Sequence, residues 1–225
     1  MQSTLPFLKH KCAALAPMAG YADRAFREIC IGYGAAFTES ELASAKALVM
    51  QDRKSKELIT VTEKERPMGI QLFGSDPSVM SQAVVKACNF TPDFIDLNMG
   101  CPAPKVASNG CGSALLRDLD NTEKIVRALV GASDVPITAK IRTGWDSESI
   151  NAVDTAKMLE QCGVSAITVH GRTREQMYSG KADLKAIADV VKAVSIPVIG
   201  NGDITDVQSA AIMLRDTGCY ALMVG

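Results

Sequence analysis

The chain has 225 residues, of which 47% are hydrophobic and 22% are charged, and its formal net charge is −1. This composition is typical of one globular domain with a full apolar core, and it excludes collagen-like, low-complexity and intrinsically disordered chains. The near-zero charge argues against binding nucleic acid through a bulk positive potential, and leaves room for a local basic patch.

We expect a cytoplasmic protein with no membrane span and no metal site. Apolar runs stay well short of the roughly 18–20 residues that cross a bilayer, and Lys9 and Lys11 interrupt the stretch where a signal peptide needs apolar residues. The seven cysteines are odd in number, and no two have the close spacing of a zinc knuckle or a redox motif. Most of the thiols are therefore expected in the core.

Eight short runs of apolar or β-branched residues predict β-strands. In chain order they are Ala13–Pro17, Ala36–Glu39, Met68–Phe73, Phe94–Asn98, Ile137–Arg142, Ala166–His170, Pro197–Gly200 and Tyr220–Gly225. Helical patterns lie between them, at Asp23–Ile31, Pro77–Cys88, Thr122–Val130, Ser149–Gln161, Leu184–Val194 and Asp206–Thr217. Such alternation is typical of right-handed parallel βαβ units.

Polar residues at the carboxyl ends of the predicted strands distinguish a doubly wound sheet from a (β/α)8 barrel. Glu39, Asn98 and His170 each end a strand. A barrel gathers these ends on one face, where barrel enzymes hold their chemistry, whereas an open sheet spreads them along an edge. We therefore predict one TIM-barrel domain over residues 1–225. Because the chain stops at Gly225, at the end of the eighth predicted strand, we expect the closing helix to be missing.

The loop after the fourth predicted strand carries the strongest chemical signal. Cys101 lies between Gly100 and Pro102, on a stiffened loop at the predicted active face. A thiol is mostly protonated at neutral pH and can donate a proton, whereas a neighbouring cation would turn it into a nucleophile. A buried structural cysteine is the simpler alternative, but the loop position favours a functional role.

Three further positions at this face suit ligand binding. Lys140 lies on a strand that helices would cover, so we expect its charge in the barrel mouth. His170 ends a strand and is suited to donating to a ligand oxygen or carrying a proton, with a core histidine as the alternative. The turn Gly200–Asp203 opens a helix and offers backbone N–H groups to an anion. The sequence has no GxGxxG, P-loop or HExxH pattern.

Six segments together resemble the tRNA-dihydrouridine synthases and look most like the bacterial B branch of that family. They follow the family's order and spacing over essentially the whole chain, and the segment around Cys101, with the strands of Lys140 and His170, is the most specific. The segments are Ala16–Gly20, Gln71–Gly74, Asn98–Pro102, Lys140–Gly144, His170–Thr173 and Gly200–Ile204.

The resemblance implies an FMN-dependent enzyme that reduces a uridine C5=C6 bond in tRNA, with NADPH as the reductant. Hydride would reach C6 and Cys101 would protonate C5, while Asn98 matches a family residue that touches the target uracil. The FMN positions of the family match Pro17, Met18, Ala19, Gln71, Lys140, His170, Asn201, Gly202, Asp203 and Gly225.

The implied partner is tRNA, whose uridine would be extruded into the pocket while basic residues at the mouth meet phosphates. Those basic residues are Lys105, Arg142, Arg172, Arg174 and Lys181. Full-length family members continue past the eighth strand with an arginine, a closing helix and a helical domain that grips tRNA, so we expect a C-terminally truncated catalytic barrel. The alternatives are a flavin barrel acting on a free pyrimidine, like dihydroorotate or dihydropyrimidine dehydrogenases, and a fragment without turnover.

Overall fold

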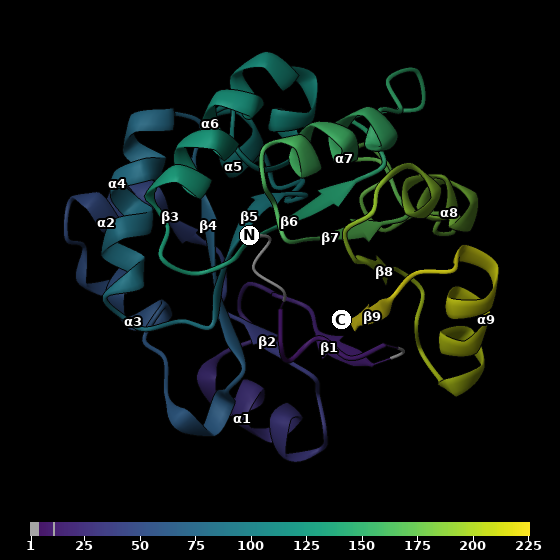
Figure 1. Ribbon diagram of the computed structural model, residues 1–225, viewed down its shortest axis with the longest axis horizontal. Helices are drawn as coiled ribbons and strands as arrows, with labels where there is room; N and C mark the ends of the chain where they lie inside the picture. The colour runs from purple at the N-terminus through teal and green to yellow at the C-terminus, as the bar shows by residue number, and fades with distance from the viewer. Residues whose placement is uncertain (1–4, 11) are drawn as a thin grey trace.

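Parallel strands curl into a barrel whose outside is covered by helices, in a computed structural model that describes residues 5–10 and 12–225 (Figure 1). Around the wall the strand order is β1-β9-β8-β7-β6-β5-β4-β2, and the short strand β3 also pairs with β4. Backbone hydrogen bonds from Ala36 N to Ala13 O (2.8 Å) and from Leu15 N to Phe37 O (3.2 Å) join β1 to the segment leading into β2. The predicted barrel is therefore confirmed, and the doubly wound sheet is wrong.

Most strands and helices lie close to their predicted places. The strands are β1 (Ala13–Leu15), β2 (Thr38–Glu39), β3 (Ala43–Ser44), β4 (Met68–Phe73), β5 (Phe94–Met99), β6 (Ile137–Arg142), β7 (Ala166–His170), β8 (Val198–Asn201) and β9 (Ala221–Val224). The α-helices are α1 (Arg24–Gly32), α2 (Ala45–Val49), α3 (Arg53–Leu58), α4 (Pro77–Cys88), α5 (Pro104–Ala107), α6 (Leu119–Ala132), α7 (Ala152–Gln161), α8 (Leu184–Ala193) and α9 (Val207–Thr217). Two 3-10 helices are η1 (Glu63–Glu65) and η2 (Gly112–Arg117). Within the described ranges, no helix is long and apolar enough to span a lipid bilayer.

The segment between β2 and β4 departs from the prediction. The sequence predicts one strand over Ala36–Glu39 and no element between it and Met68, whereas the structure has a two-residue β2 followed by β3, α2 and α3. Elements of two to six residues are too short to show a helical or alternating period. Local capping still specifies α3, because the Asp52 carboxylate accepts from Ser55 N at 2.8 Å.

The barrel interior changes from apolar at its amino end to polar near its carboxyl end. Alternate residues of a strand share one face, and on β5 these are Phe94, Asp96 and Asn98, all of them buried. Phe94 packs against Phe7 and Phe37, with ring centroids 5.3 and 5.4 Å apart. This aromatic cluster of Phe7, Phe37 and Phe94 is part of the apolar core that fills the amino end, so a ligand pocket has room at the carboxyl end.

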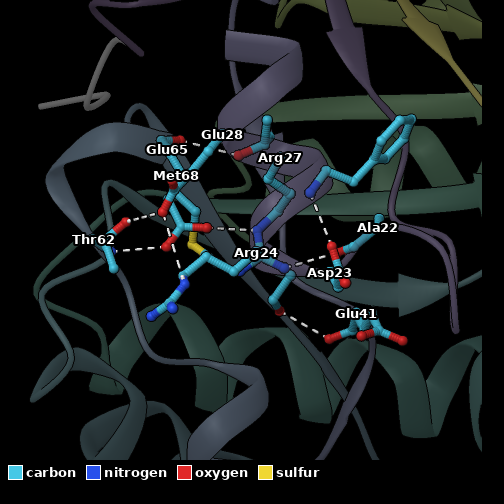
Figure 2. Close-up of polar contacts among 12 residues, drawn as sticks. Ala22, Asp23, Arg24, Arg27, Glu28, Glu41, Thr62, Glu65 and Met68 are labelled. Atoms are coloured by element: carbon cyan, nitrogen blue, oxygen red, sulfur yellow. Dashed lines mark hydrogen bonds and ion pairs between the residues drawn. The ribbon is translucent and has the colours of Figure 1, made fainter. Parts of the chain in front are cut away.

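A buried ion pair fixes the corner where the loop after β1 turns into α1 (Figure 2). Arg27 Nε lies 2.7 Å from Glu65 Oε2, and the two side chains are 3% and 0% exposed. Arg27 Nη1 also donates to Ala22 O at 2.7 Å, and Glu65 Oε1 accepts from Thr62 N at 2.8 Å. Because each charge is buried against its partner, the pair ties α1 to η1 and holds the end of the loop that follows β1.

Candidate active site

A pocket of about 700 Å³ opens at the carboxyl ends of the strands. All twelve residues that the sequence predicts for catalysis, cofactor binding or substrate binding line it, namely Pro17, Met18, Ala19, Gln71, Asn98, Cys101, Lys140, His170, Asn201, Gly202, Asp203 and Gly225. The volume lies in the range usual for sites that hold a small molecule or a cofactor. The structure therefore brings these residues to one place, while their individual roles stay predictions.

Cys101 lines this pocket on a loop that is held from both sides. Its backbone N–H donates to Asn98 Oδ1 at 2.9 Å, and its carbonyl oxygen accepts from Ser113 Oγ at 2.9 Å. A Cβ on Gly112 would lie 2.9 Å from the same carbonyl oxygen, so glycine lets η2 approach the loop. The Cys101 thiol is half-buried and free of a disulfide. It is therefore a pocket group and not a structural cysteine of the core.

Lys140 connects two strands that are not neighbours in the wall. Its Nζ donates to Asn201 Oδ1 at 2.8 Å, and Asn201 Nδ2 donates to Met223 O at 2.9 Å. Burial lowers the pKa of Lys140 to about 8, and the nearby Glu39 carboxyl limits the fall. At neutral pH the ammonium is therefore mostly charged, and an ammonium that donates one hydrogen bond has two further N–H groups for acceptors on a ligand.

His170 is neutral in this site. Burial lowers its pKa to about 3, and the cationic Lys140, Arg142 and Arg172 act in the same direction. Arg172 Nη1 lies 3.4 Å from His170 Nε2. Because a guanidinium only donates, this contact assigns the acceptor role to Nε2 and the proton to Nδ1. Of the two roles predicted from the sequence, donating to a ligand oxygen therefore fits, and carrying a proton at neutral pH does not.

The turn after β8 has the features of an anion site. Gly202 has a φ of 115°, and among the described residues the backbone N–H groups of Gly202 and Asp203 have no hydrogen-bond acceptor. The carboxylate of Asp203 is engaged elsewhere, accepting from Arg172 Nη2 at 2.6 Å and from Ala182 N at 2.7 Å. These backbone groups fit a phosphate, to which Asp203 would contribute its N–H and not its side chain.

The expectation that this turn opens a helix is wrong. Helix α9 begins only at Val207, and its N-cap is Asp206, whose carboxylate accepts from Ser209 N at 2.7 Å. An acidic cap satisfies the first turn of the helix and opposes binding of a second anion there. The N-terminus of α9 therefore does not contribute to anion binding at Gly202.

Two of the arginines expected to meet RNA phosphates are instead structural. Arg142 and Arg172 are only 2% and 5% exposed. Arg142 donates to Gly100 O, Thr173 O and Met177 O, each at 2.8 Å. The guanidinium groups are therefore used to hold the loops around the pocket, and the phosphate role assigned to them from the sequence is wrong. Lys105 and Lys181 are exposed, and Arg174 is half-buried.

Two exposed aromatic residues of the pocket have no signal in the sequence. Tyr21 and Tyr178 line the rim and are 75% and 74% exposed. Arg142 lies over the Tyr178 ring at 5.7 Å from its centroid. Single aromatic residues on loops follow no period, so only the three-dimensional structure reveals them. Among residues 5–10 and 12–225, no group of three or more His, Cys, Asp or Glu side chains is placed to hold a metal ion.

The parallel barrel with its pocket at the carboxyl ends of the strands defines a protein of the TIM-barrel class. Two solved structures share this fold with a TM-score of 0.60: a nitroalkane oxidase from Streptomyces ansochromogenes (18% identity, covering 97% of this chain and 66% of that one) and FabK from Thermotoga maritima (19% identity, covering 97% and 62%). The family model described as dihydrouridine synthase (Dus) matches residues 14–225.

Curated relatives of this chain carry the name tRNA-dihydrouridine synthase B. The protein of Vibrio vulnificus is 45% identical over 218 residues, which cover 97% of this chain and 67% of the relative. That of Pseudomonas aeruginosa is 43% identical over 211 residues, covering 94% and 64%. The chain therefore belongs to the dihydrouridine synthase family. It spans about two thirds of the length of these relatives.

Proposed function

We propose that this chain is the catalytic barrel of an enzyme that reduces the C5=C6 bond of uridine in tRNA. Membership of the dihydrouridine synthase family supports the proposal, as does 45% identity to a protein named tRNA-dihydrouridine synthase B. The observation that carries it is the convergence of Cys101, Asn98, Lys140 and His170 on one pocket. The same family match favours tRNA over a free pyrimidine as the substrate.

We further propose FMN as the cofactor and NADPH as the reductant. When bound, FMN supplies the hydride chemistry that no side chain can provide. The free N–H groups of Gly202 and Asp203 would hold its phosphate, and the charged Lys140 would donate to its polar edge. Pro17, Met18 and Ala19 line the pocket and would lie beneath the ring, while His170 and Asn201 would flank it. Gly225 also lines the pocket, and a Cβ on it would lie 2.6 Å from Ala16 Cβ, so only glycine fits against the neighbouring segment at this position.

Reduction of the C5=C6 bond needs a hydride at C6 and a proton at C5. Cys101 lines the pocket, and its thiol is the group we assign as the proton donor to C5. Asn98 can orient the base, because its Nδ2 uses one N–H on Gln71 Oε1 at 2.7 Å and has a second N–H for a uracil carbonyl. The two residues are joined by the hydrogen bond from Cys101 N to Asn98 Oδ1 at 2.9 Å, which fixes the proton donor relative to the group that orients the uracil.

The rim suits a nucleotide that is extruded from an RNA strand. Exposed aromatic rings stack on bases, and Tyr21 and Tyr178 offer such rings. Lys105 in α5 and Lys181 on a loop are exposed cations and would contact the phosphates. Extrusion costs a few kcal/mol of base stacking, which these contacts would offset.

The proposal is tested by the dihydrouridine content of tRNA from a deletion strain that expresses the intact protein. We expect the wild type to restore dihydrouridine in this strain. In a single-turnover assay of the purified intact protein, Cys101→Ala should lower the rate by about 100-fold or more. Cys30→Ala is the matched control, because Cys30 lies on α1 outside the pocket, and it should behave as the wild type. Full activity of Cys101→Ala would overturn the acid role. Turnover of free uracil or orotate without tRNA reduction would favour the free-pyrimidine alternative.

A further inference from the structure

Two buried carboxyl groups lie beneath the pocket without lining it. Asp96 on β5 is 1% exposed and Glu39 on β2 is 2% exposed. The strand between them, β4, carries Gln71, which is directly opposite Asp96 in the β4–β5 register. Burial raises the pKa of Asp96 to about 6 and raises that of Glu39 well above its ordinary value. A buried carboxyl group is costly unless its oxygens are hydrogen-bonded, so the partners of these two groups show what they hold in place.

The neighbour that they fix is the carboxamide of Gln71. Its Nε2 donates to Asp96 Oδ2 at 2.9 Å and to Glu39 Oε2 at 3.2 Å. An amide nitrogen has two N–H groups, so both donors are used, and the amide oxygen must face the opposite way. Thr138 holds Asp96 in place by donating from Oγ1 to Oδ1 at 2.7 Å.

From Gln71 the contacts continue to the loop of Cys101. Gln71 Oε1 accepts from Asn98 Nδ2 at 2.7 Å, which turns Asn98 Oδ1 toward the loop. That oxygen accepts from the backbone N–H of Cys101 at 2.9 Å. If the Gln71 amide were reversed, Nε2 would face the Nδ2 of Asn98, and two donors would oppose each other.

We propose that Asp96 is a positioning residue that sets the Cys101 loop through Gln71 and Asn98. Asp96 contributes the acceptor oxygen that it presents to Gln71. This oxygen favours one orientation of the Gln71 amide, which in turn orients the Asn98 amide and the backbone that carries the Cys101 thiol. The proposal rests on the proposed function only where it treats the thiol as the proton donor. The positioning itself concerns contacts within this chain.

The role makes a specific prediction for two substitutions of Asp96. Asp96→Asn keeps one acceptor oxygen for Gln71 and turns its amide nitrogen to Thr138, whose hydroxyl can accept a hydrogen bond. Asp96→Leu has the same branched shape, a larger volume and no acceptor, so only Glu39 Oε2, at 3.2 Å, still opposes reversal of the Gln71 amide. The asparagine variant should therefore preserve the loop, and the leucine variant should loosen it.

The experiment is alkylation of Cys101 by iodoacetamide in the intact protein, followed by peptide-resolved mass spectrometry. The rate at Cys101 is normalised to that at Cys30 and Cys88, which are half-buried and lie outside the pocket. We expect Asp96→Leu to be alkylated at least about threefold faster than the wild type, and Asp96→Asn to stay within about twofold. Thr168→Val, also in the interior but outside this set of contacts, is the matched control and should resemble the wild type.

An unchanged rate in folded Asp96→Leu overturns the proposal, and so does an Asp96→Asn variant as fast as Asp96→Leu, because charge and not orientation would then matter. If Asp96→Leu does not fold, Gln71→Met breaks the same connection one step nearer the pocket, and an unchanged rate there overturns the proposal as well. Loss of the proposed function is separable, because full tRNA reduction by Cys101→Ala would remove the acid role and leave these alkylation rates unaffected.

Discussion

Arg172 Nη1 lies 3.4 Å from His170 Nε2, and the two side chains share one wall of the pocket. A cation at this distance disfavours a second positive charge on the imidazole, so the geometry and the burial act in the same direction. The same guanidinium holds Asp203 at 2.6 Å, which links the end of β7 to the turn after β8. The histidine is therefore a fixed, neutral hydrogen-bonding group.

We predict that His170 remains neutral, with its proton on Nδ1, down to about pH 4. Its pKa is lowered from 6.5 to about 3 in the folded state. Between these two pH values the unfolded state binds a proton that the folded state does not, so the folded state loses stability as the pH falls from about 6.5 to about 3. Long-range nitrogen–proton NMR spectra report the charge and tautomer directly. The chain has only one other histidine, His10, which serves as the internal reference. An imidazolium signal from His170 near pH 6 would contradict the assignment.

Asp96 should make the stability of the folded state depend on pH in the opposite direction. Its pKa is raised from 3.8 to about 6, so the group stabilises the folded state fully at pH values below its pKa in the unfolded chain. This contribution is lost as the pH rises through about 6. Asp96→Asn removes the titration. Between about pH 4 and 6 the unfolding free energy of the wild type should therefore fall relative to the variant, by on the order of 2 kcal/mol. Urea unfolding at several pH values measures the difference, and parallel curves would show that the prediction is wrong.

Gly202→Ala should weaken binding of a phosphate-bearing cofactor by about tenfold or more and lower stability by about 1–3 kcal/mol. The glycine has a φ of 115°, and an added Cβ would lie 2.9 Å from Ala182 Cβ and 3.0 Å from His170 Cδ2. Equilibrium dialysis with FMN and urea unfolding measure the two effects. Gly131→Ala is the control, because Gly131 lies in α6 with open space around it, and alanine there should be neutral or stabilising. Equal behaviour of the two variants would contradict the strained turn.

Either half of the Arg27–Glu65 pair should be costly to remove alone. Because each substitution leaves a buried charge without its partner, Arg27→Met and Glu65→Leu should each lower the unfolding free energy by about 3–5 kcal/mol. The double variant should recover much of this loss. Arg53→Ala, which breaks an exposed pair with Glu57, should change stability by less than about 0.5 kcal/mol. Additive single effects in the double variant would mean that the two side chains are not coupled.

The sequence is sufficient to predict the parts of the site that stand at strand ends. Asn98 and His170 end their predicted strands, Cys101 lies three residues after Asn98, and a parallel barrel must bring such ends together. Asp96 lies in the middle of a strand, and its relation to Gln71 appears only once the β4–β5 register is known. Its charge within an apolar strand marks it as unusual, but the sequence does not show which side chain it contacts.

Side-chain direction is the other limit of the sequence. Arg142 is predicted at the mouth of the barrel, and the structure places it there. The sequence does not show, however, whether its long side chain reaches toward solvent or back to backbone carbonyl groups. In the structure it bonds three backbone oxygens, so its role is to shape the loops. Tyr21 and Tyr178 show the reverse case, in which residues without any pattern become part of the rim because their loops fold over the barrel.

The rings of Phe7, Phe37 and Phe94 have a kinetic consequence. Because these rings fill the barrel at the amino ends of the strands, a molecule in the pocket enters and leaves at the carboxyl ends. A nicotinamide donor and a nucleotide that both need the same face of a flavin would then exclude one another. Each would bind only after the other had left. Initial rates measured against both concentrations should accordingly give parallel, not intersecting, double-reciprocal lines.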